Sequence, residues 1–342
     1  MGQPDPQLHP WVELLRTGDH RALARAITCV VERQPLAEAL LHALFPLSGH
    51  ALVLGLTGPP GSGKSTLADA IAGHYRRAGD SVGIVAVDPT SPFTGGAILG
   101  DRIRMQQHHR DPEVFIRSLA TRGALGGLAQ SAAEVVTLLD AAGKRRILVE
   151  TVGVGQDEVD IVQLADVTLV VLVPGMGDEV QAIKAGLMEI ADIFVLNKAE
   201  RGAERLEQEI RAMLALAPRS PGAAWRPPII KTTATAGAGL DELMAAVSQR
   251  LDWIAQHGGL VHHRALQWRQ RLPSLLRDRL AEGILYPLLT PERLDQLASA
   301  LADRRADPHA AADAILAEAL QSLAPSSPAD CALGARSTKP ED

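Results

Sequence analysis

Cysteine, aromatic residues and long apolar runs are all scarce in this sequence. It has 342 residues, of which two are cysteines, Cys29 and Cys331, and 3% are aromatic. Two cysteines so far apart support neither a disulfide framework nor a thiolate metal cluster, so we expect a reducing compartment. Residues 1–10 lack the features of a signal peptide, and no apolar run approaches the roughly 18 residues of a membrane span. We therefore expect a cytoplasmic protein without a membrane anchor, in which Cys29 is a small core residue.

Positive charge is also in deficit. The formal net charge is -6 at pH 7, and no basic stripe with interleaved aromatic side chains occurs. These features argue against a nucleic-acid partner, which would usually require a basic face. The chain does have 46% apolar residues, enough at this length to bury the core of one large domain with smaller appendages.

The most informative stretch is a glycine-rich turn at residues 58–65, which follows the pattern G-x-x-x-x-G-K-[ST]. In such a loop the backbone N–H groups bind a polyphosphate, Lys64 contacts the β and γ phosphates, and the Ser65 hydroxyl can bind Mg²⁺. Residues 51–57 predict a buried parallel strand, and residues 65–77 predict an amphipathic helix whose N-terminus favours phosphate. The sequence therefore predicts a site for a nucleoside phosphate. The loop residues assigned to it are Gly58, Pro59, Pro60, Gly61, Ser62, Gly63, Lys64, Ser65 and Thr66.

Carboxylates end two further predicted strands, at Asp88 and at Glu150. Ligands of open α/β sheets gather at the carboxyl ends of the strands. A carboxylate there can hold Mg²⁺ directly or through water, and the N–H of Gly153 can bind the γ-phosphate. The alternative for both acids is the capping of a local turn or helix. Residues 89–105, rich in glycine and proline, predict a long loop of the kind that forms a switch segment.

A base-recognition pattern follows a later strand, where residues 197–200 read Asn-Lys-Ala-Glu. In the related Asn-Lys-x-Asp pattern the acid accepts hydrogen bonds from guanine, whereas the N1 lone pair of adenine would repel it. Glu200 keeps this chemistry but adds one methylene, so we expect a guanine preference that is weakened. Asn197 and Lys198 would brace the loop, and backbone N–H groups at Thr233 and Ala234 would bind the purine O6.

Six or seven strands that alternate with helices predict an α/β fold of the P-loop NTPase type, a mostly parallel sheet covered on both faces. We divide the chain into an N-terminal helical extension (1–47), a nucleotide domain (48–257), a C-terminal helical arm (258–323) and a disordered tail (324–342). The arm has more apolar surface than one helix can hide, so we expect it to pack on a partner subunit as a homodimer.

For two other groups of residues, a simple structural role is the alternative to a functional one. His108 and His109 lie in a polar turn without a third ligand at metal spacing, so we expect them to be solvated. Asp178 and Glu179 could simply cap the helix that follows residues 174–177, with Lys184 as a solvated side chain.

Four stretches together resemble one family. They are residues 58–65, Asp88-Pro89 with residues 94–101, residues 150–156 and residues 174–181. In this order they are similar to the MeaB/ArgK-type GTPases that accompany adenosylcobalamin-dependent methylmalonyl-CoA mutase, a branch of the P-loop GTPases that act as metallocentre and cofactor chaperones. The resemblance covers residues 10–320.

The resemblance implies a slow GTPase that gates the loading of intact cofactor onto an acyl-CoA mutase, or the removal of a damaged one. A cobalamin adenosyltransferase would be a third party, and the cobalamin need not touch this chain. The implied Mg²⁺ ligands are Ser65, Asp88, Asp101 and Glu150. The residues assigned to catalysis are Lys64, Glu150, Asp101 and Lys184.

A third switch is implied at Asp178, Gln181 and Lys184, which would report the state of the nucleotide to the mutase. Two residues, Pro92 and Phe93, depart from the family pattern inside the first switch and would stiffen it.

Three other functions stay open. A nickel or zinc metallochaperone GTPase would carry a Cys-rich or His-rich insertion, and this sequence has none. A small-molecule kinase would need arginines aimed at a phosphoryl acceptor, for which Arg102, Arg104 and Arg117 are candidates. A scaffold that binds nucleotide without turnover would release no phosphate even with the mutase present.

Overall fold

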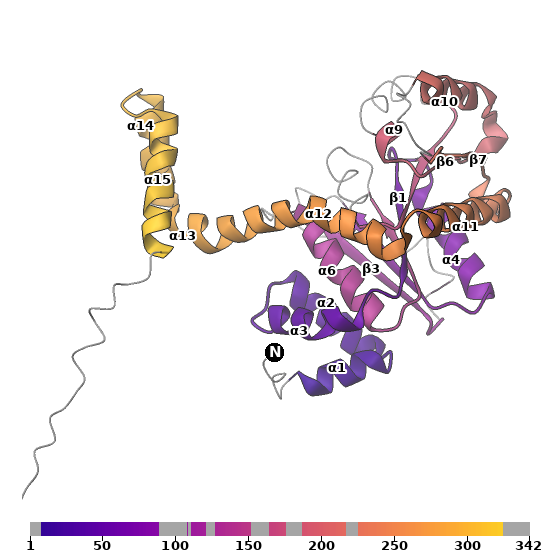
Figure 1. Ribbon diagram of the computed structural model, residues 1–342, viewed down its shortest axis with the longest axis horizontal. Helices are drawn as coiled ribbons and strands as arrows, with labels where there is room; N and C mark the ends of the chain where they lie inside the picture. The colour runs from indigo at the N-terminus through magenta and orange to yellow at the C-terminus, as the bar shows by residue number, and fades with distance from the viewer. Residues whose placement is uncertain are drawn as a thin grey trace, which may run out of the picture. The chain divides into compact units, whose positions relative to one another are not determined.

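The computed structural model describes residues 8–88, 108, 111–120, 127–151, 164–175, 187–216 and 225–323. The chain divides into two compact units, Met1–Arg271 and Leu272–Asp342 (Figure 1). Each unit is described by itself.

The first unit is built on a parallel sheet that has seven strands in the described part of the chain. Their order is β3-β2-β4-β1-β5-β6-β7, and every neighbouring pair is parallel. This confirms the predicted fold class. The strands are β1 (Leu52–Thr57), β2 (Val82–Asp88), β3 (Val114–Ala120), β4 (Arg146–Glu150), β5 (Val167–Leu172), β6 (Ile193–Leu196) and β7 (Ile229–Lys231).

Helices cover both faces of this sheet. The strands are apolar along their length because side chains alternate between two buried faces. On β1, for example, Leu54 packs in the core under α4 (Lys64–Arg77) and α11 (Leu240–Gln256), whereas Val53 packs in the core under α6 (Gly127–Ala141). The helix α10 (Glu204–Leu216) packs on β5 and β6. The short elements are α9 (Leu187–Ile190), η3 (Ala199–Arg201) and η4 (Ala234–Ala236).

The N-terminal helices form a layer outside α6 (Figure 1). This layer consists of α1 (His9–Arg16), α2 (His20–Val31), α3 (Ala37–Leu44) and the turn η1 (Phe45–Leu47). Asp19 caps α2 by accepting a hydrogen bond of 2.7 Å from the Ala22 N–H, a contact that satisfies one of the unpaired amide groups of the first turn. Cys29 is buried in the shared core, as predicted.

The helix α12 (Gly259–Leu280) begins in the first unit, where Arg264 donates to the Gly49 and Ala51 carbonyls and to Asp166. The second unit continues with a π-helical turn (Ala281–Leu285), α13 (Tyr286–Leu288), α14 (Pro291–Ala302) and α15 (Pro308–Leu323). In it, an ion pair of 2.6 Å between Arg293 and Glu318 joins α14 to α15. Among the described helices, none is both long enough and apolar enough to cross a membrane.

Candidate nucleotide site

The glycine-rich turn joins the end of β1 to the start of α4, as the sequence predicts. Gly58 has φ of +134°, and a Cβ there would collide with the Val171 carbonyl oxygen. Gly63 has φ of +87°, and its Cβ would meet the Asn197 amide nitrogen. Glycine is therefore required at both positions, because a side chain would be excluded by the neighbouring backbone and side chain as well as by the left-handed conformation.

Lys64, the first residue of α4, is buried against the same turn. Its ammonium donates to the Gly58 carbonyl at 2.7 Å and to the Pro59 carbonyl at 3.0 Å. These contacts hold the positive charge beside the loop whose amide groups are expected to bind a polyphosphate. The arrangement suits an ammonium that contacts phosphate oxygens.

Ser65 and Glu150 are brought together from positions 85 residues apart in the sequence. The Ser65 hydroxyl donates to Glu150 Oε1 at 2.7 Å, and both side chains are buried. They meet because β4 pairs with β1 in a register that places Glu150 beside Leu56, close to where the loop begins. A hydroxyl and a carboxylate supply the hard oxygen ligands that Mg²⁺ prefers, with phosphates and water to complete the shell. The backbone of Asp88 ends β2 as predicted.

No group of three His, Cys, Asp or Glu residues with metal-site geometry occurs within the described residues. The remaining predicted site residues lie outside the described ranges: Asp101, Gly153, Asp178, Gln181 and Lys184.

Asn197 connects the phosphate loop to the base loop through hydrogen bonds of its side chain. Its amide group donates to the Ser62 carbonyl at 2.9 Å, and its carbonyl oxygen accepts from the Ala234 N–H at 3.2 Å and the Thr232 hydroxyl at 3.3 Å. Lys198 adds a second link, from its ammonium to the Gly61 carbonyl at 2.8 Å. The sequence predicts this bracing role for Asn197 and Lys198, but gives no sign of Thr232, which only the folded chain brings to Asn197.

Glu200 is an exposed carboxylate fixed in direction by a neighbour. The Thr233 hydroxyl donates to Glu200 Oε2 at 2.9 Å. The Glu200 backbone N–H and then this hydroxyl lower the pKa of the Glu200 carboxyl, because hydrogen bonds to the ionised form favour it. The acid is therefore held in the charged state that a guanine edge would require.

The two amide groups that we expect to meet the purine O6 are engaged elsewhere. The Thr233 N–H donates to the Ala238 carbonyl at 3.0 Å, and the Ala234 N–H donates to Asn197. Either amide would have to give up that bond to contact a base. Thr233 instead contributes its hydroxyl, through Glu200.

One residue is more buried than the sequence suggests. His108, predicted to be solvated, has a side chain only 12% exposed, and its Nε2 lies 3.3 Å from Asp69 Oδ1 on α4. The prediction was wrong because the His108 side chain lies against Asp69 of α4. Arg117 lies on β3, where its guanidinium donates to the Thr28 hydroxyl of α2; Arg102 and Arg104, the other kinase candidates, lie outside the described residues.

The fold and the site together define a P-loop GTPase. The defining features are the parallel α/β sheet, the strand–loop–helix phosphate turn, the Ser–Glu pair at the helix start and the Asn-Lys-x-Glu base loop. The family model of the methylmalonyl-CoA mutase-associated GTPase MeaB matches residues 23–285. The chain belongs to this family, and it is an enzyme that hydrolyses GTP.

Similar proteins agree with this assignment. A protein of Pyrococcus horikoshii whose name places it among the GTPases is 46% identical over 89% of this chain and 96% of its own length. The Escherichia coli GTPase ArgK is 37% identical over 83% of this chain and 87% of its own. The mouse mitochondrial methylmalonic aciduria type A homolog is 33% identical over 78% and 68%, respectively. The crystal structure of a LAO/AO transport system kinase is 28% identical, with a TM-score of 0.68 over 94% of this chain and all of that one.

Proposed function

We propose that this chain uses GTP binding and hydrolysis to gate the loading and protection of adenosylcobalamin on an acyl-CoA mutase, either methylmalonyl-CoA mutase or a close relative. The observation that carries the proposal is the match to the MeaB family model across residues 23–285. The name of the mouse relative, which refers to methylmalonic aciduria, points to the same area of metabolism.

Magnesium is the metal that this site fits. The Ser65 hydroxyl and the Glu150 carboxylate lie 2.7 Å apart at the helix start and would hold the ion together with phosphate oxygens. A Mg²⁺ held by Ser65 and Glu150 would neutralise charge that develops on the phosphate oxygens during transfer. Lys64 contributes a second positive charge to the same oxygens, and Asn197 keeps the phosphate and base loops in register through its bond to Ser62.

We assign the gating of cofactor loading to the segments that follow the ends of three strands. The predicted switches come after β2, β4 and β5, and the third contains Asp178, Gln181 and Lys184. Because parallel strands end at one edge of the sheet, β2, β4 and β5 end at the same edge as β1, whose end leads into the phosphate loop. A γ-phosphate that orders them, and whose loss releases them, would carry the state of the nucleotide to a partner surface.

The proposed partners are the mutase, a cobalamin adenosyltransferase and a second copy of this chain. Adenosylcobalamin would bind the mutase and not this chain. We propose that the protein acts in the cytoplasm without a nucleic-acid or membrane partner.

The direct test is GTP turnover by the purified chain, measured alone and with a candidate mutase. We expect slow turnover alone, a clear rise with the correct mutase, and adenosylcobalamin transfer that depends on GTP. Turnover that is the same with every candidate mutase, with cofactor loading indifferent to GTP, would contradict the chaperone role while leaving the GTPase activity intact.

A variant of Lys184 would distinguish signalling to the mutase from nucleotide binding. We expect Lys184→Ala to keep nucleotide affinity and to lose most of the mutase-dependent rise in turnover. Arg205→Ala on the exposed face of α10 is the control. Equal stimulation in both variants would remove Lys184 from the signalling path.

A further inference from the structure

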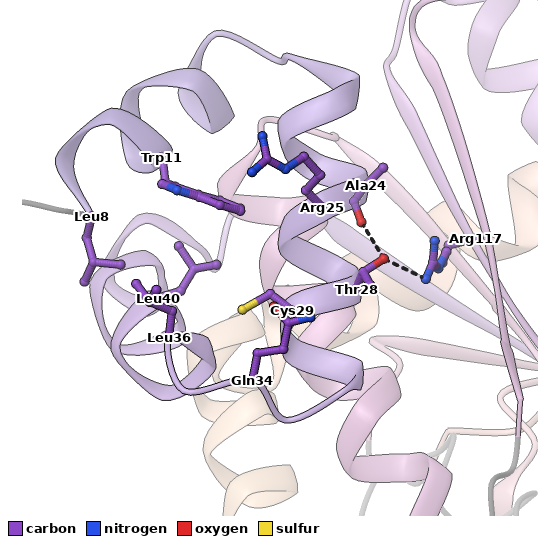
Figure 2. A pocket seen from close by; sticks show the side chains of 10 residues that line it. All are labelled: Leu8, Trp11, Ala24, Arg25, Thr28, Cys29, Gln34, Leu36, Leu40 and Arg117. Atoms are coloured by element: carbon purple, nitrogen blue, oxygen red, sulfur yellow. Dashed lines mark hydrogen bonds between the residues drawn. The ribbon is translucent and has the colours of Figure 1, made fainter.

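The N-terminal helices, the residues beside them and β3 line a cavity of about 350 Å³ (Figure 2). Ten described residues form the lining, and none of them belongs to the nucleotide site. The volume is within the range of about 300–1,000 Å³ that small-molecule sites occupy. The cavity is therefore large enough for a small molecule, and the proposed function does not involve it.

Much of the lining is a wall of apolar side chains. The wall consists of Leu8 and Trp11 at the start of α1, with Leu36 and Leu40 of the α3 segment (Figure 2). Leu8 and Leu40 are buried in the core of the first unit, so this wall is anchored. The Trp11 indole adds a broad apolar ring on which a ligand can pack.

Cys29, another residue of the lining, indicates how weakly polar this part of the molecule is. The residue is buried, and burial, with a smaller contribution from the Glu32 carboxylate, raises the pKa of the Cys29 thiol. Burial has this effect because it disfavours the charged form of a thiol. A charged group of a ligand would meet the same penalty, so the lining favours a neutral ligand.

Polar side chains of the lining are engaged with other groups of the protein. The Thr28 hydroxyl donates to the Ala24 carbonyl at 3.0 Å and accepts from Arg117 at 3.2 Å (Figure 2). The Gln34 amide group donates to the Glu32 carboxylate at 3.1 Å. A polar group of a ligand would give up its hydrogen bonds to water and meet side chains that already have partners, which costs affinity.

Arg25 also lines the cavity, but this residue is exposed to solvent. Its guanidinium lies 5.1 Å from the centre of the Trp11 ring, which is a neutral partner. An exposed charge is hydrated and screened by salt, so it adds little to the affinity of a ligand. The affinity of this cavity must therefore come from its apolar wall.

We propose that this cavity binds a small neutral molecule with an apolar body. The body would pack on Trp11 and on the three leucines of the wall, and its removal from water would supply the affinity. Cavities with apolar walls take up such molecules in other proteins. The lining shares no residue with the nucleotide site, so binding here does not require GTP.

The first test is calorimetry on the full-length chain with three eight-carbon probes that differ in charge: octan-1-ol, octanoate and octylamine. We expect one octanol to bind per chain, and octanoate and octylamine to bind at least about ten-fold more weakly, because both would carry a charge into a weakly polar site. No saturable octanol binding up to its limit of solubility, or a charged probe that binds as tightly as octanol, would overturn the proposal.

The second test varies the length of the apolar body, with pentan-1-ol, hexan-1-ol and heptan-1-ol as probes. We expect the affinity to rise by about four-fold for each added methylene, because each one removes a similar apolar area from water. An affinity that is independent of chain length would mean that the protein recognises the hydroxyl and not the body, and it would contradict the proposal.

Matched variants of two leucines locate the binding. Leu36 and Leu14 are 38% and 48% exposed, respectively, but only Leu36 lines the cavity. We expect Leu36→Ser to weaken octanol binding by about five-fold or more, and Leu14→Ser to leave it unchanged.

A second pair of variants fills the cavity in place of the ligand. Ala24 of α2 lines the cavity, so Ala24→Leu should weaken octanol binding by about ten-fold or more. Ala212→Leu on the exposed face of α10 is the control. All four variants should bind GTP as the unaltered chain does, which shows that they are folded. Equal octanol affinity in the four variants would place the binding elsewhere and overturn the assignment to this cavity.

Discussion

The Lys64 side chain lies against the phosphate loop, and its ammonium donates hydrogen bonds to the Gly58 and Pro59 carbonyls. We predict that Lys64→Ala abolishes GTP binding, with affinity lowered by at least about a hundred-fold, because a charge-assisted contact to the phosphates is lost.

Calorimetry with a non-hydrolysable GTP analogue measures this loss. Lys231→Ala is the control, because Lys231 pairs with Glu207 of α10 and not with the loop. Affinity unchanged in Lys64→Ala would remove the basis for placing the triphosphate at this turn.

We predict that the Glu150 carboxylate supports GTP binding and turnover by holding Mg²⁺. Replacement by Gln keeps the size of the side chain and its hydrogen bond with Ser65 but removes the charge. We expect Glu150→Gln to lose most of the gain in GTP affinity that Mg²⁺ provides, and to lower turnover, because the ion loses an anionic partner. Titrations with and without Mg²⁺ measure the effect, with Glu113→Gln, an exposed acid, as the control. A full Mg²⁺ response in Glu150→Gln would exclude the carboxylate from the metal site.

Glu200 determines the base preference in our interpretation. We expect Glu200→Asp to hold or tighten GTP binding, because the shorter acid is the usual partner of guanine in this pattern. The lowered pKa of Glu200 keeps its carboxylate ionised as pH falls from neutral towards its ordinary pKa, so the preference of the unaltered chain for GTP over ATP should be constant across that window. Competition binding with GTP and ATP at several pH values checks both statements. A shift to ATP in Glu200→Asp would contradict the assignment.

At the scale of elements, hydrogen bonds from Arg264 hold the helix α12 against the first unit's sheet. Arg264 donates to Asp166 at 2.8 Å, and to the Gly49 carbonyl at 2.6 Å and the Ala51 carbonyl at 2.7 Å. The side chain of Asp166 is only 2% exposed and also accepts from the Val53 N–H of β1. The hydrogen bonds to Asp166 raise the pKa of Arg264 above its ordinary value, so the guanidinium keeps its positive charge.

Removing that arginine leaves a buried carboxylate without its cation. We predict that Arg264→Met lowers the free energy of unfolding by about 3 kcal/mol, the cost typical of breaking one side of a buried ion pair. The exposed Arg269→Met on the same helix should change it by less than about 0.5 kcal/mol. Urea unfolding followed by circular dichroism measures both. A similar small change in the two variants would mean that α12 is held by other contacts.

At the scale of the whole molecule, the second unit exposes a row of leucines. Leu272, Leu276 and Leu280 of α12 are each about half exposed, and Leu294 and Leu316 of α14 and α15 are similar. The row follows the four-residue spacing of one helical face, which indicates a surface suited to another apolar surface.

We predict that the chain is a dimer and that the double variant Leu276→Lys, Leu280→Lys is a monomer, because charges are costly in an apolar interface. Sedimentation equilibrium measures the change. Leu216→Lys, which alters an exposed leucine of the first unit, is the control. A monomeric unaltered chain, or a double variant that remains a dimer, would contradict the prediction.

Much of the fold and part of the site could be predicted from the sequence because their signals are local. An apolar run such as residues 51–57 predicts a buried strand, and β1 spans Leu52–Thr57 within that run. The phosphate loop is equally local, since its glycines, Lys64 and Ser65 lie within eight residues. The contact of Ser65 with Glu150 was expected only as a shared metal site, and its geometry comes from the register of β4 on β1.

Other contacts have no local signal. Asn197 reaches Ser62 across 135 residues, and Arg264 reaches Asp166 across 98. His108 was misplaced for the same reason, since nothing near it in the sequence indicates Asp69.

The sequence by itself determined the class of the sheet, the phosphate loop and the family, because strand periodicity and a loop motif depend on neighbours in the chain. Only the tertiary structure decided that Asn197 ties the two loops together, that the amide groups of Thr233 and Ala234 are engaged, and that Arg25 and Arg117 share a cavity. Those contacts join residues far apart in sequence, and strand order and helix packing, which bring them within a few ångströms, are fixed only when the whole core forms.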